Sequence, residues 1–177
     1  AQAVDAALGG QLSRLIERKD FSGKSGDVLV LYPDGKIPAL RVIVAGFGKA
    51  ERIGLEVLRK TSATAMKKAR DLGATVIHTS LHADSGMGGM EASAEAVVEG
   101  AVLGLYRFRE LKTDKPDRAD VHRLVLVVED PSKVESVAGG AKRGQVIAES
   151  SCYARDLANL PGNVLSPVRM GEIASNM

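Results

Sequence analysis

Residues 154–167 read Ala-Arg-Asp-Leu-Ala-Asn-Leu-Pro-Gly-Asn-Val-Leu-Ser-Pro, and this stretch divides the chain into two unequal parts. Pro161 has no amide hydrogen and disfavours helix at the residue before it, so a long helix is predicted to end near Leu160. Ser166 followed by Pro167 is typical of a helix N-cap and a first helical position. We therefore expect one domain over residues 1–160. Residues 161–177 should form an interdomain linker and the start of a truncated helix leading to a missing second domain.

The composition of the 177 residues indicates a single domain with an aliphatic core. Tryptophan is absent and aromatic residues make up only 3%, so Val, Leu, Ile and Ala must fill the interior. The net charge of +2 neither requires nor excludes a nucleic-acid partner. The single cysteine, Cys152, excludes an internal disulfide and is compatible with a reducing compartment. No apolar run reaches the roughly 20 residues of a membrane span, so no membrane partner is expected.

Upstream of residue 160, helical and strand patterns alternate after an initial hairpin. This order predicts the α/β class, with a three-layer α/β/α architecture and a mixed β-sheet between the helices. The continuous apolar strand near residue 126 is typical of a strand covered on both faces. Three glycines early in the last long helix, Gly139, Gly140 and Gly144, are compatible with a break there. The expected helices cover residues 3–19, 51–72, 91–106 and 131–160, and the expected strands cover 28–32, 40–45, 74–81 and 124–128.

Two short glycine motifs resemble fragments of phosphate-binding loops. Gly23-Lys24-Ser25 ends like such a loop, but the earlier glycine it needs is replaced by Arg18, and a strand follows where a helix is required. Gly46-Phe47-Gly48 matches half of a dinucleotide fingerprint, whose third glycine falls on Glu51. We predict a surface loop for the first motif and a tight strand-to-helix turn for the second.

A third glycine-rich segment, the loop Gly86–Gly89, precedes a predicted helix whose N-terminus can face an anion. Glu91 and Glu95 in the first turns of that helix also complement its dipole, so the sequence requires no ligand there. Whether this loop binds a ligand stays open at the level of sequence.

The remaining candidates for chemistry are isolated. His78, His82 and Asp84 would share one face of an extended strand, where two imidazoles and a carboxylate can bind zinc, but satisfied strand-end histidines are the favoured interpretation. Cys152 lies in a predicted helix and is typical of a packing residue rather than a nucleophile. The basic run Lys67–Arg70 is typical of a solvated helix face, with nucleic-acid contact as the alternative.

Four segments together resemble the leucyl (cytosol) aminopeptidase family. The resemblance spans nearly the whole chain. Each segment is only moderately specific, but all four occur in the same order as in that family. The segments are Phe21-Ser22-Gly23-Lys24 with the following strand, Val44–Lys49, Glu95–Phe108 with Lys112-Thr113, and Ala154–Asn163 with Ser166-Pro167.

This resemblance implies an N-terminal, non-catalytic α/β domain with a macro-domain-like fold, followed by a larger catalytic domain. That catalytic domain would hold two divalent metals, zinc or manganese, and would hydrolyse N-terminal residues from peptides. Members of the family are typically cytoplasmic hexamers. The family's usual first strand is missing, so we expect an exposed sheet edge. None of the family's metal-binding or catalytic motifs occurs in the 177 residues, so no catalytic, cofactor-binding or metal-binding residue is assigned here.

The expected role of this domain is assembly of the oligomer and access to the active site, with its own catalytic domain as the first partner. Two alternatives come from other classes of protein. The first is a nucleotide- or ADP-ribose-binding module that uses the loop Gly86–Gly89. The second is a DNA-binding domain, whose phosphate contacts would be strongest at low salt.

Overall fold

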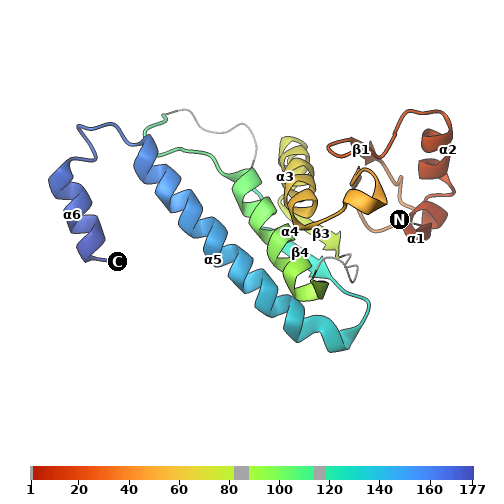
Figure 1. Cartoon of the computed structure of the whole chain (residues 1–177). Coiled ribbons are helices and arrows are strands. Elements are labelled where there is room, and N and C mark those ends of the chain that lie inside the picture. The colour runs from red at the N-terminus through yellow and green to blue at the C-terminus, as the bar shows by residue number, and fades with distance from the viewer. Residues whose placement is uncertain (1, 82–87, 114–118) are drawn as a thin grey trace.

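The computed structural model describes residues 2–81, 88–113 and 119–177 (Figure 1). Three long helices, which together take up much of the chain after residue 54, lie side by side. The helices are α1 (Gln2–Ala7), α2 (Gln11–Glu17), α3 (Leu55–Asp71), α4 (Gly89–Leu105), α5 (Val134–Asn159) and α6 (Pro167–Ser175), with short 3-10 turns at Ala50–Arg52 and Pro131–Lys133. The strands are β1 (Val28–Leu31), β2 (Val42–Ala45), β3 (Val76–Ser80) and β4 (Arg123–Val127).

The predicted helix over residues 3–19 is wrong in one respect, because it is two helices. Gly9 and Gly10 adopt φ values of 67° and 73°, a left-handed conformation that ends α1 and turns the chain into α2. The Asp5 carboxylate accepts a hydrogen bond of 2.7 Å from the amide of Leu12 and so satisfies a free donor of α2. Leu12 still packs with Leu8 in one buried cluster, which explains why the apolar spacing continued across the break.

The strands confirm the α/β class and pair in both directions, although in the described residues they form two sheets rather than one. β1 and β2 make the predicted antiparallel hairpin, with Val28 opposite Ala45 and Leu31 opposite Val42. β3 and β4 are parallel, with Val76 opposite Arg123. Helix α3 packs against the first pair.

The β3–β4 pair is covered less completely than its apolar sequence predicted. Its inner side meets α4 and α5 through Leu126, which packs beside Ala94 and Val137. Val76 and Val127 at the two ends of the pair remain exposed. The expectation that the strand at 124–128 is buried on both faces is therefore wrong at Val127, the last residue of β4.

Glycines allow the three long helices to touch through their backbones. A Cβ at Gly100 of α4 would lie 2.2 Å from the carbonyl oxygen of Arg59 in α3. A Cβ at Gly140 of α5 would lie 2.0 Å from the carbonyl oxygen of Glu91 in α4. Gly104 and Gly144 repeat these contacts one turn further along. The possible break near Gly139–Gly144 does not occur, since α5 runs without interruption and uses Gly140 and Gly144 for packing.

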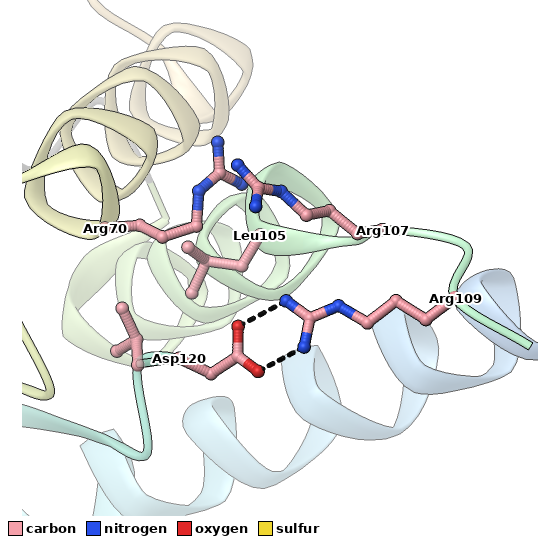
Figure 2. A pocket seen from close by; sticks show the side chains of 6 residues that line it. Arg70, Leu105, Arg107, Arg109 and Asp120 are labelled. Atoms are coloured by element: carbon pink, nitrogen blue, oxygen red, sulfur yellow. Dashed lines mark hydrogen bonds and ion pairs between the residues drawn. The ribbon is translucent and has the colours of Figure 1, made fainter. Parts of the chain in front are cut away.

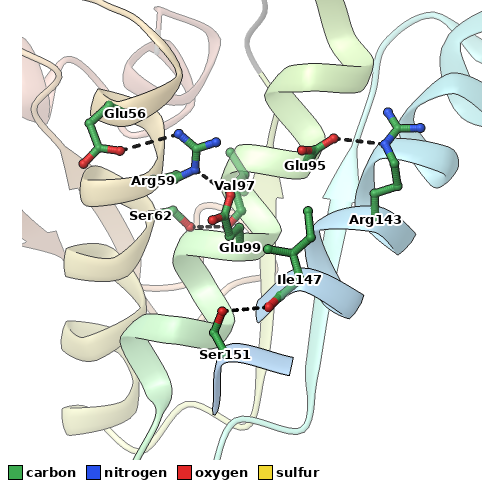
Figure 3. Close-up of polar contacts among 9 residues, drawn as sticks. All are labelled: Glu56, Arg59, Ser62, Glu95, Val97, Glu99, Arg143, Ile147 and Ser151. Carbon is green, nitrogen blue, oxygen red and sulfur yellow. Dashed lines mark hydrogen bonds and ion pairs between the residues drawn. The ribbon is translucent and has the colours of Figure 1, made fainter. Parts of the chain in front are cut away.

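Polar contacts reinforce the same helix layer (Figure 3). Arg59 of α3 donates to Glu99 of α4 at 2.5 Å, and the Ser62 hydroxyl donates to the carbonyl of Val97 at 2.7 Å. Arg143 of α5 donates to Glu95 of α4 at 3.1 Å. α4 is therefore held on both of its sides and forms the centre of the layer.

The end of α5 confirms the prediction made from residues 154–167. The helix ends at Asn159, and Leu160 before the proline adopts an extended ψ of 134°. The Ser166 hydroxyl accepts a hydrogen bond of 3.2 Å from the amide of Arg169, and Pro167 occupies the first helical position of α6. α6 lies beyond the end of α5, away from the rest of the helix layer (Figure 1).

Candidate functional site

Tyr106 joins the end of α4 to the end of α5. Its hydroxyl donates to Asp156 at 2.9 Å and accepts a hydrogen bond from the side-chain amide of Asn159 at 3.2 Å. The guanidinium of Arg155 lies 5.5 Å from the ring centroid, within the range of a cation–π contact. Burial, followed by the hydrogen bond to Asp156, raises the pKa of Tyr106, so the hydroxyl stays a donor at neutral pH. This contact unites two of the segments that carry the family resemblance.

Beside this tyrosine lies a hollow of about 190 Å³, hereafter the arginine hollow (Figure 2). Three arginines from two parts of the chain converge on it. Arg109 donates two hydrogen bonds to Asp120, one of them 2.6 Å long. This bidentate partner holds the pKa of the Asp120 carboxyl below its usual range. The lining residues are Arg70, Leu105, Arg107, Arg109, Asp120 and Val121.

The other two arginines of the hollow share one carboxylate oxygen. Arg70 Nη2 lies 3.1 Å from Asp71 Oδ1, and Arg107 Nη2 lies 3.9 Å from the same oxygen. The Arg70 side chain is only 13% exposed, whereas that of Asp71 is 58% exposed. In the described part of the chain, three guanidinium groups thus meet two carboxylates, which leaves the hollow positively charged.

A larger groove of about 620 Å³ continues from the arginine hollow toward α6. Its lining combines the charged side chains of both ends with apolar ones, among them Leu157 of α5, Leu160 just after that helix, and Ile173 of α6. No residue of α6, a helix that lies entirely in a described range, is buried. Ile173 is half-buried and the other residues of the helix are exposed. Val168 is 74% exposed. A helix with exposed apolar side chains is suited to contact with another protein surface.

The two phosphate-loop fragments pack against each other and form no cradle for an anion. A Cβ at Gly46 would lie 2.2 Å from the carbonyl oxygen of Lys24. The amide of Gly48 donates to the carbonyl of Gly23 at 2.9 Å. Gly48 itself has a φ of 81°, which is the turn geometry predicted between β2 and the following helix. The backbone amide of Gly48 is therefore hydrogen-bonded within the protein and does not face an anion.

The first half of the loop Gly86–Gly89 lies outside the described residues, as do His82 and Asp84. The described Gly88 and Gly89 lie at the start of α4 with φ values of 77° and 83°. Glu91 there accepts a hydrogen bond of 2.8 Å from Arg143, so this carboxylate serves helix packing. His78 is exposed on β3. The proposed zinc ligands and the ligand role of the loop stay predictions.

The other sequence candidates divide between packing and surface. Burial raises the pKa of the half-buried Cys152 thiol, which makes it a poor nucleophile. Lys67 and Lys68 are exposed, but Arg70 departs from this basic run and turns into the arginine hollow. Within residues 2–81, 88–113 and 119–177, no group of three or more His, Cys, Asp or Glu side chains is arranged to hold a metal ion. No helix in those ranges is long and apolar enough to span a membrane.

Sequence reasoning did not find the arginine hollow. Arg70 is separated from Arg107 by all of β3 and α4, and only the packing of the helices brings them together. The available signal was the alternation of Arg107 and Arg109 in an extended segment, which places both side chains on one side.

Comparisons with known proteins place this fold. The model of the cytosol aminopeptidase family, N-terminal domain, matches residues 1–115. The chain is 39% identical to a probable cytosol aminopeptidase of Roseiflexus castenholzii, over 98% of this chain and 36% of that protein. It is 34% identical to the cytosol aminopeptidase of Pseudomonas aeruginosa, over 100% of this chain and 36% of the relative. The chain therefore spans about a third of the length of the curated relatives it matches.

Solved structures agree with this placement. A mutant of tomato leucine aminopeptidase shares the fold with a TM-score of 0.81 and 23% identity, covering 99% of this chain and 34% of that one. The bottromycin maturation enzyme BotP in complex with Mn gives a TM-score of 0.74 at 25% identity, covering 92% of this chain and 32% of that one.

Fold and junction thus define an α/β domain with a protruding, partly apolar C-terminal helix. The chain belongs to the cytosol aminopeptidase family and corresponds to its N-terminal domain. The family resemblance found in the sequence is confirmed.

Proposed function

We propose that this chain is the accessory domain of a two-metal leucyl aminopeptidase that removes N-terminal residues from peptides. The domain would support assembly of the enzyme and shape access to its active site. The proposal is supported by the family match and by the names of the relatives, which are cytosol aminopeptidases.

The observation that carries the accessory role is the exposure of apolar side chains on α6. Val168 and Met170 are exposed on this helix, and the groove beneath it is lined by Leu160 and Ile173. Burying one such side chain stabilises an interface by about 1.5–3 kcal/mol. The proposed occupant of this surface is the enzyme's own catalytic domain.

The two metals of the proposed enzyme, zinc or manganese, would not be held by this chain. BotP was solved with Mn, which supports a divalent metal in the family. The described residues of this chain do not fit a two-metal centre, since no three donor side chains converge among them. The metals would activate water in the catalytic domain, and the residues described here would act by holding that domain in place.

The proposed enzyme is a cytoplasmic homo-hexamer, and its N-terminal domain is macro-domain-like. These finer points rest on the resemblance in four sequence segments and on the cytosol aminopeptidase names of the relatives. Peptides would reach the protein through the catalytic domain. The ADP-ribose-binding alternative rests on the loop Gly86–Gly89, of which only Gly88 and Gly89 are described, and both this and the DNA-binding alternative stay predictions.

An activity comparison tests the proposal. The 177-residue chain and the full-length product of the same gene are assayed on a leucine-amide substrate with manganese. We expect hydrolysis by the long protein alone, and its loss after treatment with a chelator. Activity in the short chain, or none in the long one, would refute the proposal.

A substitution at Val168 tests the contact with the catalytic domain. Val168→Asp should leave the melting temperature of the short chain almost unchanged, because the side chain is 74% exposed there. In the full-length protein it should lower the melting temperature, since a charge would enter a buried contact. The same small effect in both proteins would contradict the assignment of α6 to the interface.

A further inference from the structure

We propose that the arginine hollow binds a phosphate group, either free or carried by a small molecule. This inference goes beyond the proposed aminopeptidase function and does not depend on it. It rests on the convergence of Arg70, Arg107 and Arg109 on one hollow.

The charges of the hollow are unbalanced in favour of an anion. Arg109 is neutralised by Asp120 through two hydrogen bonds. Arg70 donates two hydrogen bonds to one oxygen of Asp71, and Arg107 reaches that same oxygen only at 3.9 Å, so Arg107 is the least neutralised of the three. Two guanidinium groups sharing one oxygen repel each other, and a second anion between them would relieve that repulsion.

The arginines are not explained by the negative end of α3. The carbonyl of Leu72 at that end accepts a hydrogen bond of 3.0 Å from Arg41, which reaches it from outside the hollow. Arg70 donates to Asp71 from Nε at 3.2 Å and from Nη2 at 3.1 Å, so its Nη1 group is the part that can meet a further anion. Its side chain is largely covered, so the conformation of its guanidinium is already restricted before a ligand binds.

The shape and surroundings favour a small ligand over a nucleic acid. A hollow of about 190 Å³ admits a phosphate group but not a phosphate backbone running across the surface. Outside the hollow, Glu110 lines the adjacent groove, and together with Asp71 and Asp120 it interrupts any extended basic face. Planar guanidinium groups are the side chains best matched to phosphate oxygens.

Calorimetric titration of the 177-residue chain with sodium phosphate tests this site, with ionic strength held constant by sodium chloride. We expect saturable binding. Arg70→Gln and Arg107→Gln should each raise the Kd by about tenfold to a hundredfold, as for the loss of one charge-assisted contact. Arg18→Gln is the matched control, because it removes the same charge from an exposed position on α2's C-terminal end and should leave the Kd unchanged.

Asp71→Asn supplies a change of opposite sign. This substitution removes the carboxylate that competes for both arginines, at an exposed position where folding is unaffected, so the Kd should fall severalfold. A merely destabilised hollow would not bind phosphate more tightly. Circular dichroism of each variant confirms that its helices are intact.

Two further titrations identify the source of the phosphate. A nucleoside monophosphate that binds as tightly as inorganic phosphate, or more tightly, with the same dependence on Arg70, supports a small phosphorylated ligand. Duplex DNA that binds more tightly than either, and loses affinity in the same variants, would replace the proposal with a nucleic-acid interface. Absence of saturable heat with phosphate, or an equal loss in Arg18→Gln, would overturn it.

Discussion

Two adjacent glycines in α5 should respond in opposite directions to the same substitution. Gly140 faces α4, where an added Cβ would lie 2.0 Å from the backbone oxygen of Glu91. Gly139 faces a flexible side chain, and its added Cβ would lie 3.5 Å from the Glu91 carboxylate, an ordinary contact. The perturbations are Gly140→Ala and, as the matched control, Gly139→Ala.

The magnitudes follow from two opposing effects. Alanine is more favourable than glycine in a helix interior by about 1 kcal/mol. Gly139→Ala should gain this amount and raise the melting temperature by about 2–4 °C for a chain of this size. At Gly140 the obstacle is backbone, so α5 must move away from α4 at a cost near the upper end of overpacking, about 3 kcal/mol. The net loss is about 2 kcal/mol, or about 4–8 °C.

Urea and thermal unfolding, followed by far-UV circular dichroism, measure both variants in the same buffer. The long helices dominate this signal, and the absence of tryptophan makes fluorescence a weaker probe. Equal melting temperatures for the two variants, or a stabilised Gly140→Ala, would refute the inference that the helices touch through their backbones.

Three further perturbations test the junction and its charges. Tyr106→Phe removes the hydroxyl that bridges to Asp156 and should cost about 1 kcal/mol in urea unfolding, whereas an unchanged midpoint would contradict the contact. Ser166→Ala removes the N-cap of α6 and should destabilise that helix by about 1 kcal/mol, seen as faster amide exchange in α6 than in α5. The hydrogen bonds from Arg109 lower the pKa of Asp120 in the folded state. The ion pair therefore stabilises the folded protein fully above pH 3.8, and this stabilisation is lost as the pH falls through the pKa of the folded state. Asp120→Asn should abolish this part of the acid-induced loss of stability, and parallel pH profiles for parent and variant would contradict the pairing.

Local chemistry was enough to predict the junction. Proline geometry alone located the end of α5 just before Pro161, and the Ser166-Pro167 pair located the start of α6. The hairpin of β1 and β2 was predicted in the same way, from a turn sequence between two apolar runs. Such signals act between near neighbours in sequence, so they hold whatever the rest of the chain does.

Long-range packing decided the features that the sequence did not reveal. Gly140 was interpreted as a possible break because its partner, the backbone of Glu91, lies on another helix. The arginine hollow likewise needs α3 beside the end of α4 before Arg70 can meet Arg107. At Gly10 the error had the opposite form. The apolar spacing predicted one continuous helix, but a left-handed turn divides it while the apolar residues on both sides still pack together.

The backbone contacts at Gly100, Gly104, Gly140 and Gly144 make the layer of three helices stiff. Sliding α5 by one residue along α4 would bring a side chain against a carbonyl, so the register is locked. α5 extends for 26 residues, about 39 Å at 1.5 Å per residue. Because the close contacts recur one turn apart along this length, a force on one of the two helices should displace α4 and α5 together as one body.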